Sequence, residues 1–294
     1  MVPRTTCGVI RAARTDIDEA LLSTMIIGFH RRRLYQGLTR LDLLGTAAGF
    51  LALFLVVIAS VCMAGEKRRI WVCASHLKTL GQAFVDYAHD HNDELPPAVL
   101  ESRTVITSWD IEIAPYLAPK LSKQISAEEW KNCQEKVAPI FKCPSDREPR
   151  AGAQPRSYSM PIYDLKKASW PPDEQSTEGL GLYLEAKAVK QFRVTDAAEV
   201  ELPVIKTSMV KAPADTALLV ERISILNALW APKFACIASV GEQFDAKTFG
   251  ARDFHRGKMN YLMLDGHVEL LQPSQSGGHL GTGKQGVWTI RPGD

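Results

Sequence analysis

The chain has 294 residues, 46% of them hydrophobic and 23% charged, with a formal net charge of +2. This length allows one large or two modest domains, and the hydrophobic fraction is ample for a core. A net charge so near zero excludes the strong global field of a nucleic-acid-binding protein, so we expect no nucleic-acid partner. Basic residues instead cluster at two places in the sequence, "HRRR" at 30–33 and "EKRR" at 66–69.

An uncharged apolar run lies between these two basic clusters. The 22 residues from Leu43 to Ala64 contain no formal charge, and a bilayer core needs roughly 20 helical residues. The alternative is a buried core helix, but such a helix rarely lacks a polar face over about six turns. We therefore predict a basic leader over 1–37 and a single transmembrane helix over 38–65.

The orientation of this span does not follow from charge alone, because basic residues flank both ends. A short basic arm precedes the span and a large domain follows it. We therefore expect the N-terminus in the cytoplasm, the span in the inner (cytoplasmic) membrane, and the head outside, in the periplasm or at the cell surface.

The start of the span carries an unusual order of residues. A secretory signal peptide places its small cleavage residue after the apolar core, whereas here Gly37 precedes it, followed by Leu38 and, at the fifth place, Asp42. This order resembles the type IV pilin and pseudopilin signal. The resemblance implies that prepilin peptidase cuts after Gly37 and methylates the new N-terminus at Leu38. It also implies that Asp42 neutralises that amine on a neighbouring subunit during assembly, since a buried charge is tolerable mainly when paired.

The signal departs from the family pattern, in which phenylalanine and glutamate usually occupy the positions of Leu38 and Asp42. An uncleaved signal anchor therefore stays as the alternative. Counted from Met25, "MIIGFHRRRLYQG" is a compact basic leader ending in glycine, and we hypothesise that translation starts there.

Beyond the membrane the helical pattern continues. Apolar residues recur at alternating steps of three and four, which predicts one buried stripe: Ile70, Cys73, Leu77, Leu80, Phe84 and Tyr87. We expect the helix to extend over 66–95 and to stop at Pro96-Pro97. The acidic and histidine-containing stretch at 86–94 lacks zinc-ligand spacing, so we expect a solvated helix end and predict no metal site.

Residues 96–271 predict a small α+β head with an antiparallel sheet. Ser126 and Glu129 have capping-box spacing before a helix over 127–137, and "FKCPSD" at 141–146 reads as a strand entering a turn. The run 216–220 is a short apolar strand, and 149–157 and 169–181 read as loops.

The clearest local signal is a hairpin. Strand-like runs at 259–264 and 267–271 flank Asp265-Gly266, a pair that favours a tight turn with positive φ at both positions. His255, Asp265 and His267 would come near one another at the end of this hairpin, but turn formation and side-chain hydrogen bonding are the default interpretation. The tail, 272–294, is glycine-rich, and we expect it to be mobile, with 287–290 adding an edge strand.

Six cysteines are present, and four lie in the exported part: Cys73, Cys133, Cys143 and Cys236. Four cysteines allow three complete pairings, and the sequence does not choose among them. These cysteines could form at least one disulfide if the domain faces an oxidising compartment. The alternative is that they are reduced, buried thiols.

Together these pieces resemble bacterial pilin-like proteins with a prepilin-type N-terminus and a head ending in a "DGHV" hairpin, and resemble the major pseudopilin of type II secretion. The matching residues are Gly37-Leu38-Thr39 with Asp42, Cys73, Leu77-Lys78, Leu80-Gly81, Tyr87, Asp90-His91-Asn92, Leu95-Pro96, Cys143-Pro144-Ser145-Asp146, Ser157-Tyr158-Ser159-Met160, Pro213, Thr216, Leu218-Leu219, His255, Gly257, Asn260 and Asp265-Gly266-His267-Val268.

The resemblance implies an α+β head on a long helix, membrane insertion, and assembly with like or related pilin subunits. It also implies a disulfide between Cys73 and Cys143, with Cys133–Cys143 as the rival pair. We expect a non-enzymatic structural or assembly subunit without cofactor or catalytic residues. The alternative is an uncleaved, membrane-tethered extracytoplasmic binding module. An anchored enzyme using His255, Asp265 and His267 lacks a supporting motif.

Overall fold

The computed structural model describes residues 39–101, 106–118, 134–150, 152–165, 170, 178–184, 203–232, 234–238, 242–243, 251–277 and 286–290. The chain divides into two compact units, Met1–Cys62 and Met63–Asp294. A long helix, α2 (Arg40–Asp90), is followed by a mixed α+β region that contains a sheet. The coarse fold class predicted from the sequence is therefore confirmed.

The described part of the first unit is the N-terminal stretch of α2. Within the described residues α2 is the one helix long and apolar enough to cross a membrane, by length and composition. Gly37 and Leu38, the predicted processing residues, lie outside the described residues, as does the whole leader.

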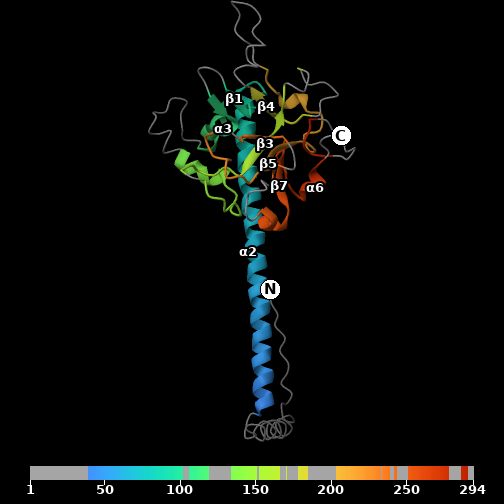
Figure 1. Ribbon diagram of the computed structural model, residues 1–294. Helices are drawn as coiled ribbons and strands as arrows, with labels where there is room; N and C mark the ends of the chain where they lie inside the picture. Colours follow the sequence, from blue (N-terminus) through green and yellow to red (C-terminus); the bar gives the residue numbers. More distant parts are fainter. Residues whose placement is uncertain are drawn as a thin grey trace, which may run out of the picture. The chain divides into compact units, whose positions relative to one another are not determined.

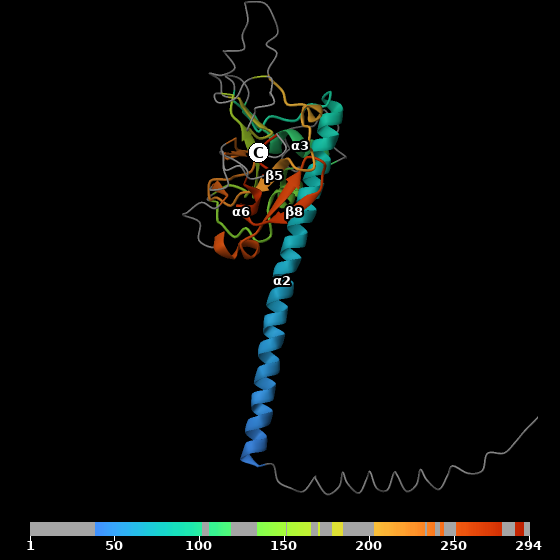
Figure 2. The same cartoon turned by 90° about the vertical axis from the view of Figure 1, so that its right-hand side faces the viewer.

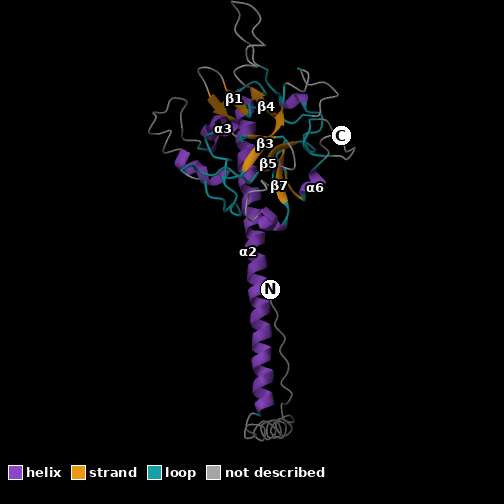
Figure 3. Cartoon of the chain, viewed as in Figure 1, coloured by secondary structure: helices purple, strands orange, loops and turns teal. Residues whose placement is uncertain are grey.

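The second unit is organised around an eight-stranded sheet (Figures 1 and 3). Its strands are β1 (Val99–Glu101), β2 (Ile106–Ser108), β3 (Tyr158–Tyr163), β4 (Gly181–Leu184), β5 (Ala217–Glu221), β6 (Cys236–Ile237), β7 (Met259–Met263) and β8 (Val268–Leu271). The order across the sheet is β2-β1-β4-β3-β5-β7-β8, and β6 pairs with β3. The predicted strand at 216–220 corresponds to β5.

The sheet is mixed, which corrects the expectation of an antiparallel sheet. The pairs β1–β2, β3–β5, β5–β7 and β7–β8 are antiparallel, whereas β1–β4, β3–β4 and β3–β6 are parallel. Turn residues in the sequence predict an antiparallel strand pair, because a tight turn reverses the direction of the chain. Parallel neighbours are joined by long connections that leave no such local signal.

Short helical segments lie between the strands and after β8. They are α3 (Trp109–Leu117), α6 (Pro273–Ser276), η1 (Ala138–Phe141), η2 (Thr207–Met209) and η4 (Ala251–Arg256). The prediction of a strand beginning at Phe141 is wrong. Phe141 is the last residue of the 3-10 helix η1, which contains Pro139. Of the helix predicted over 127–137, residues 134–137 are helical and the rest lies outside the described residues.

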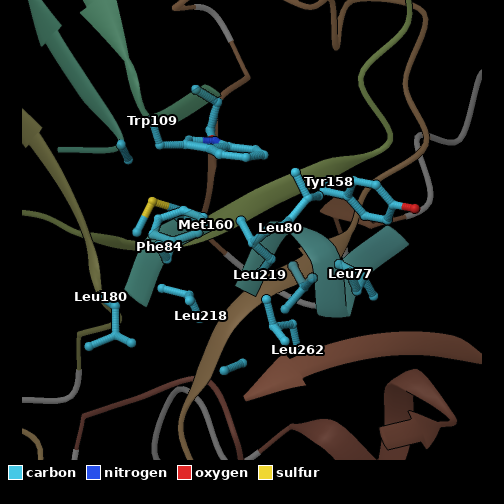
Figure 4. Close-up of a cluster of buried hydrophobic side chains, with 14 of the residues drawn as sticks. Leu77, Leu80, Phe84, Trp109, Tyr158, Met160, Leu180, Leu218, Leu219 and Leu262 are labelled. Atoms are coloured by element: carbon cyan, nitrogen blue, oxygen red, sulfur yellow. The ribbon is translucent and has the colours of Figure 1, made fainter. Parts of the chain in front are cut away.

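The predicted apolar stripe is confirmed in the C-terminal part of α2, which runs along one side of the head in Figure 2. Its buried members include Leu77, Leu80 and Phe84, which Figure 4 shows gathered with Leu219 of β5 and Leu262 of β7. This helix comes close to the sheet at Gly81, where an added Cβ would lie 3.1 Å from Leu262 Cδ1. The helix and the sheet therefore share one hydrophobic core.

The hairpin has a different turn from the one expected. β7 and β8 pair from Met259↔Leu271 to Leu262↔Val268, and Asp265 and Gly266 lie between them. Only Gly266 of the two has a positive φ, +91°. The bonds Gly266 N–H to Met263 O and Met263 N–H to His267 O fit a three-residue loop closed by a bulge at glycine.

The described part of the tail packs into the head, which corrects the expectation of a mobile tail there. Residues 287–290 form bends rather than an edge strand, and the side chains of Trp288 and Ile290 are buried. The indole N–H of Trp288 donates to Ser276 Oγ at 3.1 Å. Burial of an aromatic side chain outweighs the glycine-rich composition around it.

Candidate functional site

Among the described residues, two places are candidate functional sites. The first is the start of α2. The carboxylate of Asp42 accepts hydrogen bonds from the backbone N–H and the hydroxyl of Thr39, at 3.0 and 2.7 Å, and the Asp42 N–H donates to Thr39 Oγ1 at 3.2 Å. This is a reciprocal cap of the first turn, so Asp42 has a partner within its own chain.

The surface of α2 that follows is apolar and exposed. Its large exposed hydrophobic side chains between Leu41 and Met63 are Leu41, Leu43, Leu44, Phe50, Leu51, Leu53, Phe54, Leu55, Val56, Val57, Ile58, Val61 and Met63. Phe50, for example, is 74% exposed. A contiguous apolar surface of this kind marks contact with lipid or with another apolar surface.

The second place is a buried cluster of Cys73, Cys143, Glu221 and His255, which we call the CCEH cluster. One donor atom from each residue lies within 4.8 Å of the other three. Cys73 Sγ lies 2.5 Å from Glu221 Oε1, and His255 Nε2 lies 3.2 Å from both Cys143 Sγ and Glu221 Oε1. All four residues are buried.

Four separate elements supply these side chains. Cys73 lies on the buried stripe of α2, Cys143 follows η1, Glu221 ends β5, and His255 lies in η4. His255 and Arg256 both have positive φ, +43° and +60°. A left-handed conformation at a residue other than glycine costs of order 1–3 kcal/mol and persists only when the surroundings fix it.

A second layer of groups holds the CCEH cluster in place. The other ring nitrogen of His255, Nδ1, lies 3.1 Å from Glu66 Oε1 and 3.3 Å from Ser145 Oγ. The Tyr158 hydroxyl lies 3.1 Å from Cys73 Sγ, and the Asn260 N–H donates to Glu221 Oε2 at 2.5 Å. The side chains of Cys73, Glu221 and His255 are therefore oriented by groups outside the cluster.

The electrostatics of the CCEH cluster follow from burial and mutual contact. Burial raises the pKa of the Cys73 thiol well above its usual value, and hydrogen bonding with Cys143 and the charge of Glu221 raise it further. Burial alone would lower the pKa of His255, but the charge of Glu221 and hydrogen bonds with Cys143 and Glu221 outweigh it and raise that pKa to about 11. Cys73 is thus a neutral thiol without a metal, and a poor nucleophile.

Glu66 completes the charge arrangement on the outer side. Burial would raise the pKa of its carboxyl, but hydrogen bonds with His255, Ser145 and Arg69 outweigh burial and lower it. The imidazolium of His255 is therefore flanked by the carboxylates of Glu66 and Glu221.

The cysteines expected to form a disulfide, Cys73 and Cys143, lie together in this cluster as free thiols. The rival partner, Cys133, lies outside the described residues. Cys236 is in β6 and Cys62 is on the exposed surface of α2.

The three residues considered at the hairpin end do not form one site. His267 Nδ1 lies 2.6 Å from Asp265 Oδ1 in the turn, and its Nε2 lies 3.3 Å from Oε1 of Glu269, an exposed residue of β8. His255 instead faces the CCEH cluster.

Sequence reasoning missed Glu221 and expected no metal ligands. Consecutive members of the cluster are 34 to 78 positions apart in the sequence, so no spacing motif joins them. The one available signal was a glutamate directly after the fully apolar run Ala217–Val220, because a charge at the end of a buried strand requires a partner.

Comparison with models of known protein families, with characterised proteins and with solved structures gives no match.

Proposed function

We propose that this protein is a single-pass membrane protein that serves as a pilin- or pseudopilin-like structural subunit. In this proposal the N-terminal part of α2 lies in the inner membrane or in a filament core, and the head lies outside the cytoplasm. The observation that carries the proposal is the exposed apolar surface of α2 from Leu41 to Met63. We assign no catalytic role and no nucleic-acid partner.

The exposed apolar surface of α2 must be shielded from water. Burying apolar area contributes roughly 25 cal/mol per Å², so leaving more than a dozen large side chains in water is strongly unfavourable. Lipid tails cover this surface in the isolated subunit. In an assembly, the same surface packs against the equivalent helices of other subunits.

Asp42 is the proposed assembly residue. Its carboxylate caps the first turn through Thr39, and in an apolar surrounding it still requires a counter-charge. Cleavage after Gly37 by prepilin peptidase would create an amine at Leu38, next to Thr39 in the chain. The amine of a neighbouring subunit is the cation that this carboxylate would bind.

The second candidate is an uncleaved anchor that presents the head as a binding module. The observation that favours it is the reciprocal cap between Thr39 and Asp42, because that cap gives one carboxylate oxygen of Asp42, Oδ2, two hydrogen bonds without any neighbour. In this case Asp42 stabilises the helix start and takes no part in assembly.

N-terminal sequencing and intact-mass analysis of the membrane form separate the two candidates. A chain that begins at methylated Leu38 supports the subunit, and a chain that retains Gly37 supports the anchor. Recovery of the full-length chain in the soluble fraction without detergent would contradict both.

Substitution of Asp42 tests its role directly. We expect Asp42→Ala to insert into the membrane normally but to lose cross-linking between copies, while Asp42→Glu retains it. Thr46→Ala is the matched control in the next turn. Equal cross-linking of Asp42→Ala and the unmodified chain would remove Asp42 from assembly.

A further inference from the structure

We propose that the CCEH cluster binds one Zn²⁺ ion as a structural site that fastens α2 to the sheet of the head. The inference is independent of the proposed function, because it concerns the interior of the second unit alone. It assigns a metal to four residues for which the sequence predicted none.

Two of the donor-atom separations come close to those of a tetrahedral site, and a third is shorter. Zinc lies about 2.3 Å from sulfur and about 2.0–2.2 Å from nitrogen or oxygen, so neighbouring ligand atoms in a tetrahedron are roughly 3.3–3.8 Å apart. The separations of His255 Nε2 from Cys143 Sγ and Glu221 Oε1 are both 3.2 Å. Cys73 Sγ and Glu221 Oε1, now 2.5 Å apart, would have to separate by roughly 1 Å to admit the ion.

The second layer matches the requirements of a metal site. A metal-bound imidazole usually donates its other ring N–H to a carboxylate, which fixes the tautomer. His255 directs Nε2 into the cluster and Nδ1 toward Glu66 Oε1 at 3.1 Å. Likewise one oxygen of Glu221 faces the cluster while the other accepts the Asn260 N–H.

The chemistry of the donors selects the class of metal. Two sulfur atoms and one imidazole suit Zn²⁺ and other borderline or soft ions, whereas Mg²⁺ and Ca²⁺ prefer oxygen. Four protein ligands close the site and leave no position for a substrate, which is typical of structural zinc. The ion therefore supplies stability rather than catalysis.

Metal binding would change the protonation of the CCEH cluster. Without the metal, the buried carboxylate of Glu221 is paired with His255. On binding, the thiols of Cys73 and Cys143 and the Nε2–H of His255 each release a proton to solvent. Two thiolates and the Glu221 carboxylate then bind the 2+ ion, and Tyr158 donates to Cys73 Sγ.

The competing state is the disulfide between Cys73 and Cys143 that the family resemblance implies. It would bring the two sulfur atoms to about 2.05 Å and remove both thiolates from Glu221 and His255. Zinc and the disulfide exclude one another, so one experiment decides between them.

The test uses the full-length chain, purified in detergent with a tag free of histidine and cysteine. We expect about one zinc per chain by elemental mass spectrometry, and an intact mass with Cys73 and Cys143 reduced. Cys143→Ser and His255→Gln should lose the zinc, whereas the matched controls Cys236→Ser and His267→Gln keep it. A metal-free chain, a Cys73–Cys143 disulfide, or equal loss in the controls would overturn the proposal.

Two further measurements do not depend on the folding of these variants. Cobalt added to the metal-free, reduced wild-type chain should give the visible bands of a tetrahedral site and a thiolate-to-cobalt charge-transfer band; absence of that band overturns the site. Glu66→Gln leaves all four ligands in place and should weaken zinc affinity roughly 10–100-fold through the loss of its bond to His255. An unchanged affinity would remove Glu66 from its positioning role.

Discussion

The guanidinium of Arg156 and the carboxylate of Asp110 form a fully buried ion pair, with Nη1 2.7 Å from Oδ1. The pair joins α3 to the segment before β3, and its remaining polar atoms are also bonded. Arg156 Nε donates to Asn227 Oδ1 at 2.8 Å, and the Trp230 N–H donates to Asp110 Oδ2 at 2.7 Å. Removing one partner would therefore leave a buried charge without compensation.

We expect Asp110→Asn to lower the free energy of unfolding by about 3–5 kcal/mol, the usual cost of an orphaned buried charge. Denaturant unfolding of the full-length chain in detergent, followed by tryptophan fluorescence, measures this difference. Glu101→Gln, at an exposed acid in β1, is the control and should change stability by less than about 0.5 kcal/mol. Equal effects of the two substitutions would contradict a structural role for the pair.

The second prediction concerns the face of α2 that packs on the sheet. Leu80 is fully buried, whereas Val85 on the same helix is 54% exposed. Leu80→Ala should cost about 2–5 kcal/mol through lost burial and the cavity that remains, and Val85→Ala should cost less than about 0.5 kcal/mol. The same unfolding measurement compares them, and a smaller effect at Leu80 than at Val85 would refute the packing described here.

The third prediction concerns the bulge at Gly266. Its φ of +91° disfavours side chains, although an added Cβ would meet nothing within 4 Å. Gly266→Ala should therefore destabilise the head by about 1–2 kcal/mol from backbone conformation alone. Gly266→Asn should cost less, because asparagine adopts the left-handed region more readily. An alanine variant as stable as the glycine would mean that the hairpin has a different turn.

The fourth prediction is a pH dependence at His76. Burial lowers the pKa of His76 below 6.5, although a hydrogen bond with the Lys142 carbonyl opposes the shift. The unfolded chain then binds the proton more readily than the folded chain, so this contribution to stability is complete above pH 6.5 and is lost as pH falls through the folded pKa.

We therefore expect unfolding free energy to decrease below pH 6.5 and His76→Gln to make that decrease shallower. His89→Gln is the matched control on the same helix, since the His89 side chain is 88% exposed. Parallel pH profiles for His76→Gln and the unmodified chain would show that another group causes the acid sensitivity.

Local patterns in the sequence predicted several elements correctly. The apolar stripe of α2, the strand at 216–220 and the paired runs around Asp265-Gly266 all depend on the period of a helix or strand and on turn chemistry. These determinants act between residues a few positions apart. The strand expected at Phe141 was wrong because the prolines nearby favour a 3-10 turn, and the expected edge strand at 287–290 was wrong because Trp288 packs inward instead.

The sequence by itself determined the long apolar helix, the buried stripe of its C-terminal part and the place of the hairpin, because each of these depends on neighbours along the chain. Only the tertiary structure decided the parallel strand pairs and the gathering of Cys73, Cys143, Glu221 and His255. The path of the chain brings these four residues together across more than 180 positions. Contacts at such separations form through the packing of whole elements, and no local period or spacing encodes them.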